Sequence, residues 1–415
     1  KKKTSVEDDI RSRLRGFART IPSFLMAYGD LETTLATFDD NIKDAVFKEV
    51  TGITLDQFRA LRDTYNFFDP VVFDESVQEF LRKKAELANY FDDSQEEDIF
   101  DYIPPQKTNQ IFTPKWVVKM MIDKLEEENP GLFADKTKTF ADLYVKSGLY
   151  LTEIVTRLYK GLEDTIPDNK ARLKHILENQ VHGFAPSEII HAIAKNFVYG
   201  NFADIDNSNL QCRDLTEAAK NGEKLKMKFD VVVGNPPYQD ENVGDNKQAT
   251  PVYNLFYDLA ESVAPVYALI SPARFLAKQG ATPKEWNKKM LNDEHLNIEY
   301  FNAKSDEVFP NVDIKGGVVV IYRDKNKNFG SIDTFIPFNE LRSIYHKVRA
   351  INSGNISHFV YSPDSYRFTD ALFTENPILV GRTDNAHAKA VASSVFERYP
   401  EVFLESKPED GEDYV

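Results

Sequence analysis

The sequence predicts an α/β fold, in which helices cover both faces of a mostly parallel sheet and an all-helical segment precedes the sheet. Two observations predict it. Apolar runs of strand length alternate with helix-like stretches beyond about residue 105, and the residues before that point show helical spacing alone. The strand-like runs are residues 229–233, 267–270 and 318–322, and the helix-like stretches are residues 149–159, 187–198 and 252–263. Alternating elements of this kind build parallel sheets, whose ligands bind beyond the carboxyl ends of the strands.

Residues 5 to about 90 are expected to form an all-helical segment. Their apolar side chains recur every three or four positions, as at Val77, Phe80, Leu81 and Leu87. No cluster of catalytic residue types occurs in this stretch.

The charge balance argues weakly against a nucleic-acid partner. The 415 residues include 51 basic and 66 acidic ones, which gives a net charge of −15. Most of the excess lies in two windows, residues 92–101 with six acids and no base and residues 400–415 with six acids and one lysine. We interpret these windows as a solvated linker and a frayed tail, because runs of like charge repel one another, with phosphate mimicry or partner binding as the alternative. The remaining residues are nearly neutral and can carry a local basic face.

Cysteine content and hydropathy narrow the class of protein. Cys212 is the single cysteine, which excludes an internal disulfide and every zinc or iron–sulfur site made of several cysteines. No apolar run reaches the roughly 18 to 20 residues that cross a bilayer. We therefore expect a soluble, cytoplasmic protein. The chain lacks an initiating methionine, and we expect it to be a fragment of a longer protein.

The most informative feature is the strand-like run at residues 229–233, which leads through Gly234 into Asn235, Pro236, Pro237 and Tyr238. Two prolines cannot continue a central strand because each lacks an amide donor, so the chain must leave the sheet in a stiff loop. Such a loop fixes the side-chain oxygen of the asparagine and the carbonyl of the first proline as two neighbouring acceptors. The tyrosine adds a flat face for stacking. This set suits an amine on a planar ring, although a structural turn with a surface tyrosine is the alternative.

The Asn-Pro-Pro-Tyr tetrad resembles the catalytic motif of the S-adenosylmethionine-dependent N6-adenine DNA methyltransferases of restriction–modification systems. The resemblance implies a Rossmann-like methyltransferase fold and S-adenosyl-L-methionine as cofactor. It also implies that Asn235 and Pro236 bind the target amine in a loop stiffened by Pro237, and that Tyr238 stacks on an adenine flipped out of duplex DNA. Catalysis would then rest on positioning and electrostatics rather than on a strong base.

Upstream, Phe112, Thr113 and Pro114 resemble the segment that closes over the methionine end of the cofactor in this family. Its place before the cofactor strand matches the gamma order of the family's motifs. The alternative is a plain helix start, with threonine as the N-cap and proline at the first helical position.

The family's cofactor loop has its counterpart in Asp142, Ser147 and Gly148, and Asp214 stands where the family presents an aspartate to the adenine of the cofactor. The loop departs from the family pattern at Lys146, where a glycine is usual. A lysine with positive φ would cost about 1 to 2 kcal/mol, so the loop is expected to be reshaped. The alternative for Asp214 is a helix cap at the surface.

A second departure is Ala185, which stands where the family places an acid that binds the cofactor's ribose. Glu188 is near in sequence and is a candidate to replace it, although it also suits the first turn of a helix. Phe309 resembles the second aromatic that the family places against the flipped base, and a buried core residue is its alternative.

The resemblance also implies a domain organisation. We expect a helical, coupler-like segment with an acidic linker at residues 1–103, a methyltransferase domain at 104–335, and the start of a target-recognition region with an acidic tail at 336–415. The expected partners are duplex DNA and fused or associated restriction, helicase and target-recognition modules, without a membrane. Two alternatives stay open: a glutamine-N5 protein methyltransferase that uses the same tetrad, and a catalytically degenerate DNA-binding or assembly module.

Overall fold

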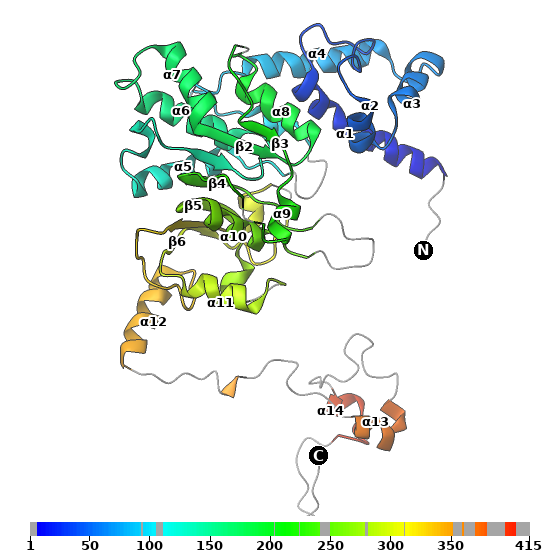
Figure 1. The fold of residues 1–415 in the computed structure, drawn as a ribbon. Coiled ribbons are helices and arrows are strands. Elements are labelled where there is room, and N and C mark those ends of the chain that lie inside the picture. Colours follow the sequence, from blue (N-terminus) through cyan, green and yellow to red (C-terminus); the bar gives the residue numbers. More distant parts are fainter. Residues whose placement is uncertain are drawn as a thin grey trace, which may run out of the picture. The chain divides into compact units, whose positions relative to one another are not determined.

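The computed structural model describes residues 6–92, 94–104, 111–202, 204–223, 225–240, 250–278, 281–310, 312–351, 359–360, 370–379 and 395–403. The chain divides into two compact units, Lys1–Phe335 and Ile336–Val415. The first unit contains the sheet and the N-terminal helices, which are coloured blue to yellow in Figure 1.

A seven-stranded sheet forms the centre of the first unit, and its strand order is β3-β2-β1-β4-β5-β7-β6. The strands are β1 (Phe140–Asp142), β2 (Val181–Ala185), β3 (Leu210–Cys212), β4 (Val231–Gly234), β5 (Val266–Pro272), β6 (Leu296–Asn302) and β7 (Val318–Asp324). The neighbours from β3 to β5 pair in parallel, and β7 is antiparallel to both β5 and β6. The predicted mostly parallel sheet is therefore confirmed.

Helices surround this sheet and continue into the N-terminal segment. The α-helices of the unit are α1 (Val6–Tyr28), α2 (Asp44–Thr51), α3 (Leu55–Arg59), α4 (Pro70–Glu86), α5 (Lys115–Glu128), α6 (Leu149–Gly161), α7 (Asn169–His175), α8 (Glu188–Tyr199), α9 (Thr216–Lys220), α10 (Tyr253–Val263) and α11 (Lys284–Asn292). Short helical turns are η1 (Ala60–Thr64), η2 (Ile99–Tyr102), η4 (Leu132–Ala134), η5 (Ile176–Gln180), η6 (Ala273–Ala277) and η7 (Ser305–Glu307). The three strands and three helices expected from apolar patterns are present, with ends displaced by at most two residues.

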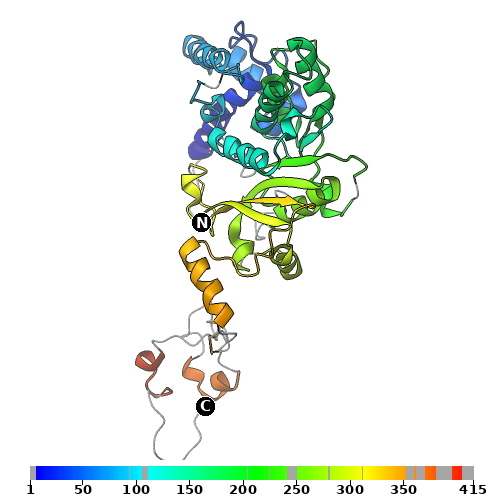
Figure 2. The same cartoon turned by 90° about the vertical axis from the view of Figure 1, so that its left-hand side faces the viewer.

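The sheet separates two hydrophobic cores, as the alternation along β4 shows. Val231 and Val233 belong to the core that contains side chains of α5, α6 and α8, whereas Val232 belongs to the core with α9, α10 and α11. Successive strand residues point to opposite faces, so a strand whose residues are all buried must be covered on both sides. Figures 1 and 2 show these helices on the two faces of the sheet.

The first helix, α1, joins the N-terminal segment to the α/β region by packing against α8. Phenylalanines fill the interior of the segment, and Phe24 stacks on Phe47 with ring centroids 5.3 Å apart. The predicted helical character of residues 5–90 is confirmed for the described part. The acidic window that follows is not wholly a solvated linker, because Ile99 and Phe100 of η2 are buried and Asp98 accepts a hydrogen bond from the amide of Phe100.

Strand order reverses between β1 and β4, because β2 follows β1 on one side while β4 lies on the other. In open parallel sheets the crevice beyond the carboxyl ends of two such strands is the usual ligand site. At the opposite edge, Asp230 links the amino-terminal ends of β1 and β4. Its carboxylate accepts hydrogen bonds from the amide and the hydroxyl of Thr139 and from Lys138. The carboxyl ends lead into the loops that begin after Asp142 and Gly234.

The second unit contains α12 (Asn339–Ile351), α13 (Asp370–Glu375), η9 (Pro377–Leu379) and α14 (Val395–Arg398). Along α12, Leu341, Ile344 and Val348 are each more than half exposed and recur at helical spacing. Of the helices that the structure describes in either unit, none combines the length and the apolar character needed to span a bilayer.

Candidate active site

Asn235 directly follows strand β4, at the crevice where the strand order reverses between β1 and β4. The strand is buried along its whole length, and Asn235 follows its last residue with only 3% of its surface exposed. Pro236 and Pro237 are also buried, and Tyr238 is partly buried against both hydrophobic cores. The stiff loop predicted after the strand is therefore held inside the protein rather than at its surface.

Asn235 is bonded to Thr113, a residue far earlier in the chain. Its side-chain nitrogen donates to the hydroxyl oxygen of Thr113 over 3.1 Å, and both side chains are buried. Thr113 is not the N-cap of the helix that follows, because Pro114 occupies that position and no side chain caps α5. The helix-cap alternative for Thr113 is thus wrong, and its hydroxyl instead fixes the orientation of the asparagine amide.

This hydrogen bond leaves the other end of the Asn235 amide without a partner. Among the residues that the structure describes, none donates a hydrogen bond to Oδ1 of Asn235, although this atom is buried. An unsatisfied buried acceptor costs about 1 to 3 kcal/mol. Such atoms are rare in native proteins and need an explanation, which a ligand amine that donates to Oδ1 would supply.

Asp142 ends β1 and brings a carboxyl group to the same crevice. The side chain is 3% exposed, and Oδ1 accepts a hydrogen bond from the amide of Tyr144 over 3.0 Å. Burial raises the pKa of Asp142 to about 7, against the opposing effects of that hydrogen bond and of the charge on Lys146. The carboxyl also explains Gly234 of β4, since a β-carbon there would lie 2.7 Å from Oδ1 of Asp142.

The loop after Asp142 reaches α6 through Ser147 and Gly148. Oγ of Ser147 accepts a hydrogen bond from the amide of Leu149 over 3.2 Å. Gly148 has a φ of +93° and precedes α6, so a side chain at this position would be strained. Lys146 is not among the described non-glycine residues with positive φ, so the loop is reshaped and avoids the strain expected of a lysine in that conformation.

Lys146 itself turns inward to the tetrad. The side chain is only 7% exposed, and Nζ lies 5.6 Å from the centroid of the Tyr238 ring. The sequence identified this lysine only as a departure from the family's cofactor loop. Its contact with the predicted stacking residue depends on the side-chain direction, which no local pattern reveals.

Tyr150 is a further buried residue of the crevice that sequence reasoning missed. Burial raises its pKa, with a smaller contribution from the charge of Asp142, and a hydrogen bond with Thr113 acts in the opposite direction. Its hydroxyl also lies 3.2 Å from Sδ of Met121 in α5. The residue belongs to the buried stripe of α6, and the stripe alone indicates a core side chain rather than a neighbour of the site.

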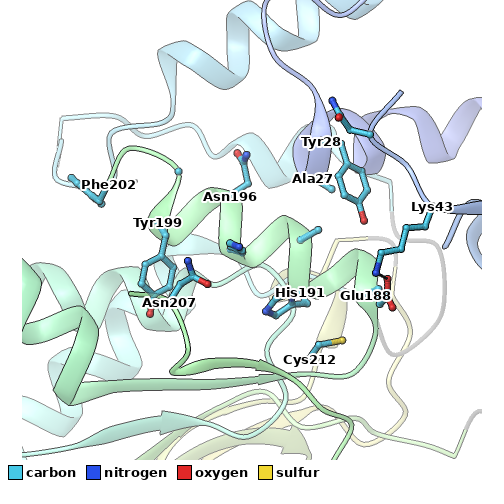
Figure 3. A pocket seen from close by; sticks show the side chains of 14 residues that line it. Ala27, Tyr28, Lys43, Glu188, His191, Asn196, Tyr199, Phe202, Asn207 and Cys212 are labelled. Carbon is cyan, nitrogen blue, oxygen red and sulfur yellow. Dashed lines mark hydrogen bonds and ion pairs between the residues drawn. The ribbon is translucent and has the colours of Figure 1, made fainter. Parts of the chain in front are cut away.

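Glu188, the candidate to replace the acid absent at Ala185, is paired with the N-terminal segment in this structure. Its carboxylate binds Nζ of Lys43 over 2.9 Å and so links α8 to the N-terminal segment. The two residues line a cavity of about 840 Å³ with Tyr28, His191 and Cys212 (Figure 3). None of the predicted cofactor residues is among those that line this cavity, so Glu188 faces a different space.

Three other predicted residues occupy more ordinary positions. Asp214 is exposed, and its Oδ1 accepts a hydrogen bond from the amide of Thr216, the first residue of α9, although Leu215 is the N-cap of that helix. Phe309 is 2% exposed in the core that contains α5 and α6. Phe112 is partly buried with its ring 4.9 Å from that of Phe100. The proposed contacts of Asp214 and Phe309 with cofactor and base stay predictions.

The profile of one protein family matches the sheet region of the chain. The family is the Eco57I restriction-modification methylases, and the match covers residues 138–309, from two residues before β1 to the last residue predicted to face the base. The matched stretch resembles this family and contains the cofactor loop, the Asn-Pro-Pro-Tyr tetrad and Phe309, whereas Thr113 lies before the match.

Other similarities are to a protein known from its sequence and to solved structures. The chain is 23% identical over 325 residues to an uncharacterized adenine-specific methylase of Mycoplasma pneumoniae. The aligned region covers 60% of this chain and 76% of that protein. The type ISP restriction-modification enzyme LlaGI, solved with a DNA substrate mimic, is 14% identical with a TM-score of 0.45 over 78% of this chain. A type I methyltransferase subunit from Streptococcus thermophilus is 15% identical with a TM-score of 0.40, over 77% of this chain and 73% of that one. The chain spans only 33% of the LlaGI structure.

Proposed function

We propose that this protein transfers a methyl group from S-adenosylmethionine to the N6 amine of an adenine flipped out of duplex DNA. It would act as the modification module of a restriction–modification or phage-defence enzyme. One observation carries the proposal: the buried Oδ1 of Asn235 accepts no hydrogen bond from any described residue, while the nitrogen of the same amide is held by Thr113. The oxygen of this amide is therefore available to accept a hydrogen bond from a ligand.

In this proposal the tetrad binds the target base. Asn235 and the carbonyl of Pro236 accept the two hydrogens of the exocyclic amine, which leaves the nitrogen lone pair directed at the methyl donor. Tyr238 stacks on the adenine ring, a contact worth about 1 to 3 kcal/mol per base. Because Thr113 and the two prolines fix the acceptors in advance, little reorganisation is needed when the base enters.

The proposed cofactor supplies an activated methyl group as a sulfonium. The crevice fits such a group, because Asp142 brings a buried carboxyl to the carboxyl end of β1 and Asn235 offers an unsatisfied acceptor beside it. Asp142 and the backbone of Ser147 and Gly148 would hold the cofactor, with Phe112 and Pro114 closing over its methionine end and Asp214 near its adenine. Ala185 provides no acid for the ribose, so the cofactor should be held mainly from its methionine end.

The test is single-molecule sequencing of DNA from cells that express the intact gene or its Asn235→Ala variant. We expect N6-methyladenine at one sequence motif with the wild-type gene and none with the variant. The purified protein should also pass a labelled methyl group to plasmid DNA. If the protein binds the cofactor but labels a release-factor-like protein and no DNA, the proposed substrate is wrong.

The proposal extends to partners. Duplex DNA would be the substrate, and target-recognition and restriction or helicase modules would act with the methylase domain, either in one chain or in an assembly. Purification of the intact gene product from its host, followed by mass spectrometry of the complex, tests this part.

A further inference from the structure

Lys146 introduces a buried positive charge into the cofactor loop. The side chain is 7% exposed, and burying an ammonium group is costly unless other groups compensate its charge. Two groups do so here. Nζ lies 5.6 Å from the centroid of the Tyr238 ring, at a distance typical of cation–π contacts, and the charge acts on the carboxyl of Asp142. The lysine thus connects the cofactor loop to the tetrad.

The proposed reaction requires a second cation in this same space. The sulfonium of the cofactor must face an amine held between Asn235 and Tyr238, and the ammonium of Lys146 already lies near that ring. The crevice is poor in water, since Asp142, Lys146 and Asn235 are each less than 10% exposed. Like charges repel more strongly in such surroundings than in water.

We infer that Lys146 makes the site discriminate against the cationic cofactor and in favour of its neutral thioether product, S-adenosylhomocysteine. This inference rests on the proposed function and adds a specificity-determining residue to it. The two ligands share their adenosine, amino and carboxylate groups and differ at sulfur by one methyl group and one positive charge. The ratio of their affinities therefore isolates the interaction of Lys146 with the sulfonium.

The experiment compares the two ligands by titration calorimetry on the wild-type chain and on variants of Lys146. Lys146→Met keeps most of the stem and removes the charge, and Lys146→Arg keeps the charge as a matched control. We expect Lys146→Met to shift the affinity ratio about tenfold towards S-adenosylmethionine, about 1.4 kcal/mol, and Lys146→Arg to leave the ratio near that of the wild type. Circular dichroism melting verifies that each variant is folded, and Lys146→Gly replaces the methionine variant if that one does not fold.

Other outcomes separate this inference from the proposed function. If Lys146→Met weakens both ligands equally, the lysine binds the carboxylate that they share, and the inference is overturned while the proposed cofactor stands. An unchanged ratio with unchanged affinities overturns it as well. If neither ligand binds the wild-type protein, the proposed function fails, and the inference fails with it.

Discussion

The side-chain amide of Asn235 donates a hydrogen bond to the hydroxyl of Thr113, across 122 residues of sequence, over 3.1 Å. This bond decides which end of the amide faces the crevice, because an amide rotated by half a turn would present its donors to an incoming amine. Thr113 is therefore a positioning residue in the proposed reaction.

Replacement of the threonine tests this role. Thr113→Val removes the hydroxyl at nearly constant volume and leaves the buried amide nitrogen without its acceptor. We expect a loss of about 1 to 3 kcal/mol in the free energy of unfolding and a fall of about a hundredfold in the rate of methyl transfer. Urea denaturation and a labelled-methyl assay measure the two effects. Thr113→Ser keeps the hydroxyl and should retain most of the rate; equal rates in the valine and serine variants would contradict the role.

Local patterns were enough to predict the sheet and the crevice. The apolar run that becomes β4 and the two prolines after Gly234 identify a buried strand and its exit, because both signals lie within a few adjacent residues. The contact of Thr113 with Asn235 could not be predicted in this way, since it depends on the pairing of distant segments. The sequence showed only that Phe112, Thr113 and Pro114 resemble a cofactor-closing segment.

The sequence was less informative where side-chain direction decides the outcome. Lys146 departs from the family's loop pattern and Glu188 is close in sequence to Ala185, but neither observation indicates which group the side chain contacts. The stem of Lys146 turns inward to Tyr238, whereas Glu188 pairs with Lys43 of the N-terminal segment. A long flexible side chain can reach several partners from one backbone position, so its contact is set by the assembled surroundings.

Gly234 provides a second test, because its α-carbon faces the carboxyl of Asp142. A β-carbon there would lie 2.7 Å from Oδ1, so Gly234→Ala must displace a buried carboxyl. We expect it to lower the free energy of unfolding by about 1 to 3 kcal/mol. In an Asp142→Ala background the same change should cost much less, because the obstructing oxygen is gone.

A double-mutant cycle by urea denaturation gives the coupling between the two positions. Gly16→Ala is the matched control: it lies inside α1, and apart from the adjacent backbone of that helix its added β-carbon would meet no atom of the described residues within 4 Å. Helix propensity predicts a small gain in stability for the control, of about 0.5 to 1 kcal/mol. Additive effects of Gly234→Ala and Asp142→Ala would rule out the close approach.

The pH dependence of stability should report the buried carboxyl. The pKa of Asp142 is about 7 in the folded protein, whereas an aspartate in an unfolded chain titrates near 3.9. Between these values the folded state holds more protons than the unfolded chain, so this group makes the free energy of unfolding fall as pH rises from about 4 to about 7. Asp142→Asn cannot titrate and removes that fall.

We therefore expect Asp142→Asn to gain stability relative to the wild type across this window, by an amount on the order of 4 kcal/mol at most, and to gain no more above about pH 7. Lys146 is the cation that acts on this carboxyl, and its charge reduces the effect without reversing it. Urea denaturation at pH 5, 6, 7 and 8 measures the difference. A difference that does not change with pH would show that Asp142 stays ionised throughout.

Glu188 is expected to contribute little to cofactor binding. Its ion pair with Lys43 is exposed, with 51% and 73% of the two side chains accessible, and such pairs contribute about 0.2 to 1 kcal/mol. Glu188→Gln should change the dissociation constant for S-adenosylmethionine by less than about twofold. Asp142→Ala should weaken the cofactor by more than about tenfold in the same calorimetric titration. A tenfold loss in Glu188→Gln would instead assign this residue to the ribose.

Phe309 and Tyr238 are the two aromatic residues predicted to face the base, and their burial gives them different expected behaviour. Phe309 is 2% exposed in the core, so Phe309→Leu should lower the free energy of unfolding by about 1 to 2 kcal/mol through imperfect packing. At a temperature where the variant is fully folded, its rate of methyl transfer should stay within about threefold of the wild type.

Tyr238→Leu removes the proposed stacking face and should reduce the rate of methyl transfer by about a hundredfold, because base–aromatic stacking contributes about 1 to 3 kcal/mol.

Fluorescence of 2-aminopurine placed at the target adenine separates stacking from packing. A flipped 2-aminopurine that stacks on the ring of Tyr238 has its fluorescence quenched by that ring. We expect the quenching to be lost in Tyr238→Leu and kept in Phe309→Leu. If Phe309→Leu melts like the wild type but no longer quenches the flipped base, Phe309 must leave the core when DNA binds and complete the base pocket. The melting curve and the fluorescence of Phe309→Leu together thus decide whether Phe309 stays in the core when DNA binds.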